Sequence, residues 1–244
     1  MIEAGSLIRS LSGRHAARNF HNFVINEIGR AIVSGASPVG SVLASDAVMM
    51  ERYGVSRTVL REAIKTLEAK GLVEARPKVG TRVSPRSRWN YFDSQVLAWH
   101  FHAPADARFY QNLFAVREAL ELPAGEGAAR FRTAEHVRIM KYWLHQASTA
   151  GDSDEQFGLA ALEIHAQIAE ASQNTLLRSV VGVIELLLAL ALTRSSETVM
   201  AYRQASIAIL EKTVLAIEEG ASDATRDHLL ACLALDHARV MEGV

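Results

Sequence analysis

Hydrophobic and polar positions repeat with the period of an α-helix through the first part of the chain. Residues 20–34 and residues 45–53 each carry apolar side chains three or four positions apart. Residues 56–70 follow the same period more strongly, with one apolar face and one basic face. Gly54 before this last segment and Gly71 after it supply a turn and a helix end. The pattern predicts three helices joined by short turns.

The period changes from 3.6 to 2 after Gly71, which predicts a small sheet. Residues 72–76 and 81–83 read as two strands, residues 77–80 as the tight turn between them, and residues 39–43 as a further short strand. The hairpin carries three basic side chains, those of Arg76, Lys78 and Arg82. Three helices followed by a basic ribbon predict a winged helix-turn-helix, which places its last helix in the major groove of DNA. An ordinary surface hairpin is the alternative for the ribbon.

The remainder of the chain is helical in pattern. Seven helices are expected after the polar and basic segment 84–88, and they cover residues 92–101, 109–131, 133–150, 155–171, 174–194, 197–219 and 222–241. Pro123 is expected to kink the second of them, and Ser195-Ser196-Glu197 to cap the sixth. Alternating helices with short connections are typical of a helical bundle.

The predicted fold is therefore mainly α. A flexible arm (residues 1–17) precedes the winged helix-turn-helix domain (residues 18–84), and a linker (residues 85–91) leads to an all-helical domain (residues 92–244).

Charge separates the two predicted domains. Residues 1–90 hold 14 Lys and Arg against 7 Asp and Glu, whereas residues 91–244 hold 12 against 20. A basic module joined to an acidic one favours a nucleic-acid-binding protein whose second domain avoids the phosphate backbone.

Cysteine content and hydropathy indicate the cytoplasm. The single cysteine, Cys232, excludes an internal disulfide and fits a reducing compartment. The first residues show no continuous apolar core of a signal peptide. The most apolar run, residues 180–192, is expected to be a buried helix, because a membrane span takes about 20 apolar residues. We therefore expect a cytoplasmic protein with no membrane partner.

The stretch GVSRTVLREAIKTLEAKGLVEARPKVGTRV (residues 54–83) resembles the winged-helix domain of the GntR family of bacterial transcription regulators, and the likeness extends over residues 20–84. The helical part resembles the effector domain of the FadR-like subfamily, abbreviated FCD, through VREALELP (residues 116–123) and LEIHAQIAEASQN (residues 162–174). The segment RSRWNYFDSQVLAW (residues 86–99) further resembles the regulators of galactonate utilisation within that subfamily.

The resemblance implies a DNA-contacting set of eight exposed polar residues: Ser45, Ser56, Arg57, Thr58, Arg61, Lys65, Arg76 and Lys78. Arg57 and Arg61 have the donor geometry for guanine or phosphate, and hydroxyls at a helix N-terminus suit phosphate oxygens. One departure concerns the preceding helix, where the family usually has an arginine in a Ser-Glu-Arg-like run and this chain has Ser45-Asp46-Ala47. One expected contact with the operator is therefore missing.

The resemblance also implies a divalent metal, which the residues of this chain do not favour. Many members of the subfamily bind it through an aspartate, a histidine four residues later, and two further histidines. Here His165 matches the first histidine, but the other positions hold Ala161, Leu210 and Cys232. A lone imidazole is a poor cation site, and the pair His228 and Cys232 is a common chance spacing. We expect no metal and no other cofactor, with His165 as a hydrogen-bonding residue.

Arg117 is the most informative residue of the predicted effector domain. It lies among apolar positions of a helix, and a buried arginine must be paired. Glu121, four residues later, is one candidate partner, and a ligand carboxylate gripped by the bidentate guanidinium is the other, which the resemblance favours. The candidate effector-binding set comprises Arg117, Glu121, His165, Arg194 and Arg203. For the last two, a solvated surface position is the alternative.

These features predict a ligand-responsive transcription regulator, more often a repressor in this family, that binds double-stranded operator DNA as a homodimer. Its effector is expected to be a small carboxylate such as a sugar acid. One alternative is an architectural DNA-binding protein without an effector. The other is an enzyme acting through His165, Glu163 and Arg117, although the sequence offers no nucleophile motif and no phosphate loop.

Overall fold

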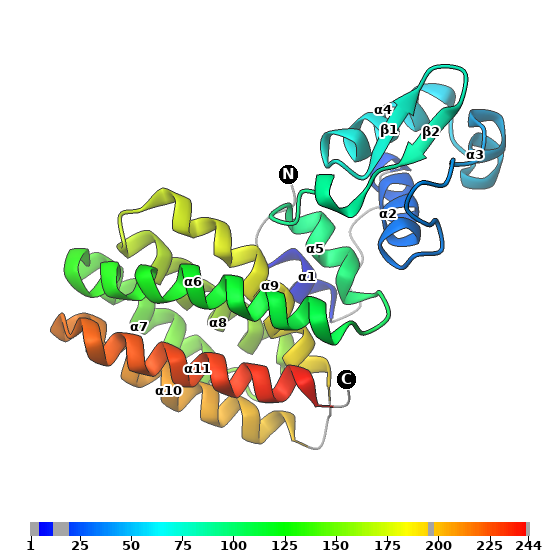
Figure 1. Ribbon diagram of the computed structural model, residues 1–244. Helices are drawn as coiled ribbons and strands as arrows, with labels where there is room; N and C mark the ends of the chain where they lie inside the picture. The colour runs from blue at the N-terminus through cyan, green and yellow to red at the C-terminus, as the bar shows by residue number, and fades with distance from the viewer. Residues whose placement is uncertain (1–4, 12–19, 195–197, 243–244) are drawn as a thin grey trace. The chain divides into compact units, whose positions relative to one another are not determined.

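The computed structural model describes residues 5–11, 20–194 and 198–242 (Figure 1). The chain divides into two compact units, of which one comprises residues 15–104 and the other residues 1–14 together with residues 105–244. The N-terminal unit contains helices and a two-stranded sheet, and the described elements of the C-terminal unit are helices. The predicted mainly α fold is confirmed.

The N-terminal unit has the predicted order of helices and hairpin. Its elements are α2 (Phe20–Val33), α3 (Asp46–Tyr53), α4 (Arg57–Ala69), β1 (Val73–Arg76), β2 (Gly80–Val83), η1 (Arg86–Arg88) and α5 (Ser94–Phe101). Gly54 ends α3 in the left-handed conformation, with φ of 63°, which glycine adopts without strain. A tight turn of this kind between α3 and α4 is what the helix-turn-helix requires.

The hairpin pairs β1 and β2 in antiparallel register, with Val73 opposite Val83 and Arg76 opposite Gly80. The segment expected as a further short strand adds a single bridge, from Val42 to Arg82, supported by the hydrogen bond from Leu43 N to Thr81 O. The wing is therefore anchored along β2 to the chain that precedes α3.

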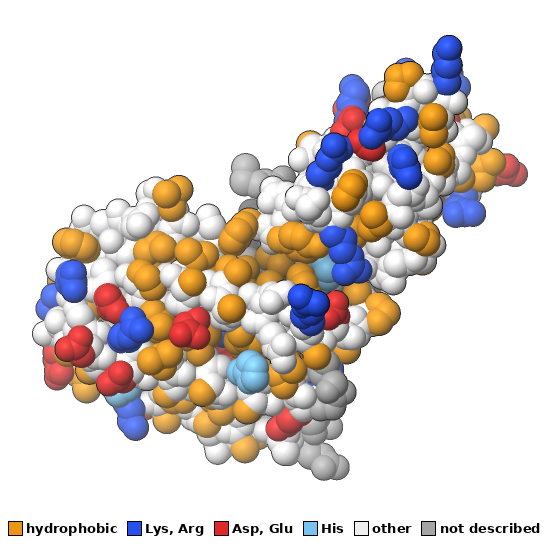
Figure 2. Space-filling view, viewed as in Figure 1, with side chains coloured by type: hydrophobic (Ala, Val, Ile, Leu, Met, Phe, Trp, Pro, Cys, Tyr) orange, Lys and Arg blue, Asp and Glu red, His pale blue; other side chains and the backbone are white. Residues whose placement is uncertain are grey.

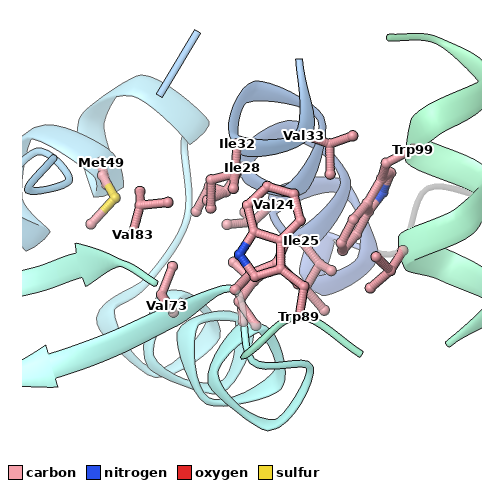
Figure 3. Close-up of a cluster of buried hydrophobic side chains, with 14 of the residues drawn as sticks. Val24, Ile25, Ile28, Ile32, Val33, Met49, Val73, Val83, Trp89 and Trp99 are labelled. Atoms are coloured by element: carbon pink, nitrogen blue, oxygen red, sulfur yellow. The ribbon is translucent and has the colours of Figure 1, made fainter. Parts of the chain in front are cut away.

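The boundary between the units differs from the predicted linker at residues 85–91. Trp89 and α5 belong to the core of the N-terminal unit, where Figure 3 shows Trp89 and Trp99 among the side chains of α2. The Trp99 indole lies directly over Gly29, where a Cβ would come within 2.5 Å of the ring, and its Nε1 donates to Asn26 Oδ1 at 2.9 Å. Of the polar segment at residues 84–88, Ser84 is buried and residues 85–88 are exposed on the surface of this unit. The helix expected from residue 92, observed as α5, was wrongly assigned to the effector domain.

Gly71, which follows α4, is required by both conformation and space. Its φ is 78°, and a Cβ would lie 2.0 Å from the carbonyl oxygen of Arg88. Gly35 shares the left-handed conformation, with φ of 85°, but has no atom within 4 Å of its Cβ position. We expect Gly35→Ala to lower the free energy of unfolding by about 1 kcal/mol through strain alone, and Gly71→Ala to lower it at least twice as much. Urea unfolding of the two variants measures the difference, and equal losses would show that the close approach to Arg88 is relieved at no cost.

The C-terminal unit is built around one apolar helix. Its elements are α1 (Ser6–Ser10), α6 (Ala107–Phe131), α7 (Ala134–Ser148), α8 (Asp154–Ala171), η2 (Thr175–Val180), α9 (Val181–Thr193), α10 (Val199–Glu219) and α11 (Ser222–Met241). Pro123 lies inside α6 without ending it. Ser195-Ser196-Glu197, expected to cap α10, lie outside the described residues.

Almost all side chains of α9 are buried, as predicted for this run. Because η2 leads directly into α9, the continuous helical stretch covers residues 175–193, close to the expected helix at residues 174–194. Residues 175–193 therefore have the length and composition of a membrane span, but 67% of their most apolar window is buried inside the unit. Such burial is typical of the core helix of a globular domain.

The first described residues dock on the helical unit, which differs from the flexible arm expected for residues 1–17. Leu7 and Ile8 are buried, and the side chain of Ile8 packs over Gly158 of α8. Glu185, in the middle of apolar α9, accepts the backbone N–H of Leu7 at 2.7 Å and that of Ile8 at 3.4 Å. The helix α1 thus supplies the donors that a buried carboxylate needs.

Glu185 should make the stability of the C-terminal unit depend on pH. Burial raises the pKa of Glu185 above its ordinary value of 4.5, although the N–H groups of Gly5, Leu7 and Ile8 act against the shift. The pKa of Glu185 is 4.5 in the unfolded chain and higher in the folded protein. Between the two, the folded state binds more protons than the unfolded state, so the free energy of unfolding falls as pH rises from 4.5. We expect Glu185→Gln, which keeps an acceptor oxygen and does not ionise, to show a smaller fall between pH 4.5 and pH 7.

Urea unfolding across this pH range measures the effect, and Glu118→Gln, at an exposed position of α6, is the matched control. A pH dependence that is the same in both variants would contradict the assignment to Glu185.

Candidate DNA interface and effector site

All eight residues predicted to contact DNA are exposed in the structure. Arg57, Thr58, Arg61 and Lys65 lie along the outer face of α4, whose inner face buries Leu60, Ala63 and Leu67. Figure 2 shows basic side chains gathered on the N-terminal unit. An exposed basic helix face after a tight turn is the geometry of a recognition helix.

The two serines act as helix caps. Ser45 Oγ accepts the N–H of Val48 at 3.5 Å at the start of α3, and Ser56 Oγ accepts the N–H of Val59 at 3.4 Å at the start of α4. These bonds orient both hydroxyls at helix N-termini, where the helix dipole favours an anion. Their predicted contact with phosphate is compatible with capping, because a hydroxyl also donates one hydrogen bond.

The wing holds some of its basic side chains in ion pairs. Arg76 and Arg88 both bind Glu74, at 2.7 Å and 2.6 Å, and the hydrogen bond from Arg76 lowers the pKa of Glu74. Arg82 Nε donates to Gly40 O at 2.6 Å, which ties β2 to the segment before α3. Lys78 lies at the tip of the hairpin with φ of 65°. A groove between α4 and the hairpin is lined by residues of both charges. They include Thr58, Arg61, Glu62, Lys65 and Glu68 on the helix side and Ala75 and Thr81 on the sheet side.

A cluster of charged side chains occupies the interior of the C-terminal unit. Arg117 of α6 is fully buried, and its Nε donates to Glu121 Oε2 at 2.6 Å. Its Nη1 donates to Asp236 Oδ2, on α11, at 2.5 Å, and its Nη2 lies 3.9 Å from Cys232 Sγ. The local partner Glu121, one of the two alternatives considered for Arg117, is therefore confirmed as an ion-pair partner.

Two further side chains complete this cluster, which we call the Arg117 cluster: Arg117, Glu121, His165, Tyr202, Cys232 and Asp236. His165 Nδ1 of α8 contacts Glu121 Oε1, and the Tyr202 hydroxyl of α10 donates to Asp236 Oδ1 at 2.8 Å. All six residues are buried. The cluster joins α6, α8, α10 and α11 through polar contacts in a low-dielectric interior.

The pKa shifts follow from this burial and pairing. Burial acts to lower the pKa of Arg117, but the charges of Glu121 and Asp236 outweigh it and raise that pKa well above its ordinary value. Burial acts to raise the pKa of Glu121, and Arg117 and His165 outweigh it, so the pKa is lowered to about 2. Burial and the charge of Asp236 raise the pKa of the Cys232 thiol. Arg117 and Glu121 are therefore charged at neutral pH, while Cys232 is neutral.

The residues around His165 do not fit the divalent metal site of the subfamily. Ala161 and Leu210 offer no donor atom, and Cys232 is a neutral thiol beside a guanidinium, whereas a metal binds the thiolate. Within the described parts of the chain, no three or more His, Cys, Asp and Glu side chains form a group that could hold a metal ion.

Arg194 and Arg203, the weaker effector candidates, have other partners. Arg203 is buried rather than solvated, because its Nη2 donates to Gly151 O at 2.6 Å, its Nη1 lies 3.2 Å from Asp154 Oδ1, and its guanidinium stacks over Phe157. Arg194 is partly buried, and its Nε donates to Val240 O at 3.0 Å. These contacts hold helix ends together and lie outside the Arg117 cluster.

Sequence reasoning missed Asp236 and Tyr202. Asp236 follows Cys232 by four residues, so it lies on the same face of α11 as the position considered for a metal ligand. That spacing was the available signal. Tyr202 gave none, since a single tyrosine in an apolar helix is most often a core residue.

Each of the two units matches a known protein family. Residues 20–83 match the family model of bacterial regulatory proteins of the gntR family, and residues 112–235 match the model of the FCD domain.

Similar curated proteins include the HTH-type transcriptional regulator YieP of Escherichia coli (strain K12), which is 31% identical over 166 residues, or 67% of this chain and 72% of that protein. The galactonate operon transcriptional repressor of the same organism is 28% identical over 155 residues, or 64% of this chain and 68% of that protein.

Among solved structures, that of Lar, described as controlling the expression of the Listeria monocytogenes agr system, covers 94% of this chain and 100% of its own with a TM-score of 0.69 and 17% identity. This likeness supports the fold. Together with the exposed recognition helix, the family matches identify a ligand-responsive DNA-binding transcription regulator and not an enzyme. The chain belongs to the GntR family of bacterial regulatory proteins, and its C-terminal unit is an FCD domain.

Proposed function

We propose that this regulator is a cytoplasmic homodimeric repressor whose effector is a small carboxylate of the sugar-acid class. The observation that carries the proposal is the buried guanidinium of Arg117 at the centre of the FCD domain. Arginine binds carboxylates through two parallel N–H groups more strongly than other side chains do. One similar protein is named for the control of a sugar-acid operon, the galactonate operon transcriptional repressor of Escherichia coli.

The proposed DNA contacts are those of the exposed face of α4 and the tip of the wing. In a two-fold dimer, each α4 enters a major groove about one helical turn from the other, with Arg57 and Arg61 reaching base edges or phosphates. Lys78 lies at the tip of the wing, where it reaches the backbone or the minor groove. Ser45, Ser56, Thr58, Lys65 and Arg76 complete the phosphate contacts.

The proposed effector is recognised without a metal, because the positions of the subfamily ligand set hold Ala161, Leu210 and Cys232. Effector binding shifts the population between two packings of the FCD domain, only one of which supports tight operator binding. Arg194 and Arg203 act in this scheme by holding helix ends, since their described contacts lie away from Arg117.

The test is a gel mobility shift on DNA from immediately upstream of the regulator's own gene, with and without D-galactonate, other sugar acids and dicarboxylic acids. Specific binding that one acid releases supports the repressor and the effector class together. A specific complex that no acid alters contradicts the carboxylate effector while leaving the DNA-binding function intact. Sedimentation of the free protein measures the oligomeric state, and a monomer at the concentration of operator binding contradicts the homodimer.

A further inference from the structure

The Arg117 cluster already supplies the guanidinium with two carboxylates. Glu121 Oε2 binds Nε at 2.6 Å and Asp236 Oδ2 binds Nη1 at 2.5 Å, and all three side chains are at most 3% exposed. Two carboxylates therefore share one guanidinium in a region closed to water. The two carboxylates already outnumber the guanidinium, so adding a third would place a further negative charge in the interior, which is strongly unfavourable.

We propose that Asp236 occupies the position on Arg117 that the carboxylate of the effector takes, so that binding exchanges an internal carboxylate for an external one. This inference rests on the proposed function, because it concerns how the same guanidinium receives its ligand. The exchange leaves the number of carboxylates that bind Arg117 unchanged, and the displaced carboxylate of Asp236 keeps a hydrogen-bond donor in the Tyr202 hydroxyl.

Asp236 is the exchangeable partner because of where it is held. Glu121 lies on the same helix as Arg117, four residues away, and its second oxygen contacts His165. Asp236 comes from α11, 119 residues along the chain, and its second oxygen accepts the Tyr202 hydroxyl at 2.8 Å. When Asp236 leaves Arg117, it keeps the hydrogen bond from Tyr202. Glu121, in contrast, remains beside Arg117 through the geometry of the helix.

The exchange would connect effector binding to helix packing. The bond between Arg117 and Asp236 is a buried polar link between α6 and α11, which pack against each other along their lengths. Its replacement by a bond to the effector frees α11 to move against α6, which is the kind of bistable contact that transmits a local event. Asp236 also weakens the apparent affinity for the effector, because only a fraction of the molecules have Arg117 free of Asp236 and able to bind it.

Chemical rescue tests whether this position accepts an external carboxylate, with acetate as the probe. We expect Asp236→Ala to lower the thermal midpoint of unfolding and acetate to raise it again in a saturable manner, while acetamide has no such effect. In the wild-type protein Asp236 competes for the position, so the same response should need an acetate concentration at least tenfold higher. The double variant Arg117→Met/Asp236→Ala should lose the response. Absence of acetate rescue in Asp236→Ala would overturn the inference.

A second variant covers the case in which Asp236→Ala does not fold. Asp236→Asn keeps the shape of the side chain and removes its charge, so the acid that releases the operator complex should bind this variant at least tenfold more tightly than the wild type in calorimetric titration. The matched control is Glu121→Gln, which removes the same charge from the other partner of Arg117. Equal tightening in the two variants would show a general charge effect and overturn the exchange.

The proposed function and the exchange at Arg117 are tested by different experiments, so one can fail without the other. If no acid releases the operator complex, the gel-shift result contradicts the effector class, whereas acetate rescue still decides whether Arg117 accepts an external carboxylate in place of Asp236.

Discussion

Replacing Arg117 with methionine is expected to lower the free energy of unfolding of the FCD domain by about 3–5 kcal/mol, because Glu121 and Asp236 would remain buried without their cation. The hydrophobic replacement fills a similar volume, so the loss reports the uncompensated charges more than a cavity. Urea unfolding measures the loss. Trp143 lies on α7 of the FCD domain, whereas Trp89 and Trp99 lie in the N-terminal unit, so variants with one tryptophan each report the two units separately.

The control for this experiment is Arg226→Met. Arg226 pairs with Glu126 at 2.9 Å, but 47% and 33% of the two side chains are exposed. An exposed pair of this kind contributes about 1 kcal/mol or less. Equal losses for the two variants would contradict the view that Arg117 holds the interior of the domain together.

Replacing Arg57 with alanine is expected to weaken specific operator binding about 5- to 150-fold, which corresponds to the 1–3 kcal/mol of one bidentate contact with a base. Because the Arg57 side chain is exposed at the first position of α4, the free energy of unfolding should change by less than about 0.5 kcal/mol. The measurement is an operator titration at fixed salt concentration, accompanied by urea unfolding.

Arg138→Ala provides the comparison, because Arg138 is also an exposed arginine and its partner, Glu135, lies on the same helix of the FCD domain. This variant should bind the operator as the wild type does. Unchanged affinity in Arg57→Ala would show that α4 is not the recognition helix or that Arg57 points away from the DNA.

The elements of the winged domain could be predicted from the sequence because their determinants are local. Helical periodicity, the serine caps and the glycine turns lie within a few residues of the elements that they define, and the structure has the predicted helices and hairpin. The assignment of α5 could not be predicted in this way. It depends on Trp99 packing over Gly29, seventy residues earlier in the chain, and the polar composition of residues 84–88 suggested a linker.

In the candidate effector site, too, the local contact could be predicted from the sequence and the long-range contact could not. Glu121 was identified as a possible partner of Arg117 because four residues along a helix place two side chains together. Asp236 lies 119 residues from Arg117, so the pairing depends on the packing of α11 against α6, which no local pattern reports. The docking of α1 depends in the same way on Glu185, almost 180 residues further along the chain.

The docking of α1 also determines how this protein can be shortened or labelled. A truncated protein that begins at Phe20 would keep every helix and strand of the winged domain. Judged from that domain alone, the truncation would seem harmless. It would remove the two N–H groups bonded to Glu185 and expose the surface of α8 and α9 that Leu7 and Ile8 cover. The damage would therefore fall on the domain at the opposite end of the sequence. Measurements of the effector response accordingly need a protein that retains residues 5–11.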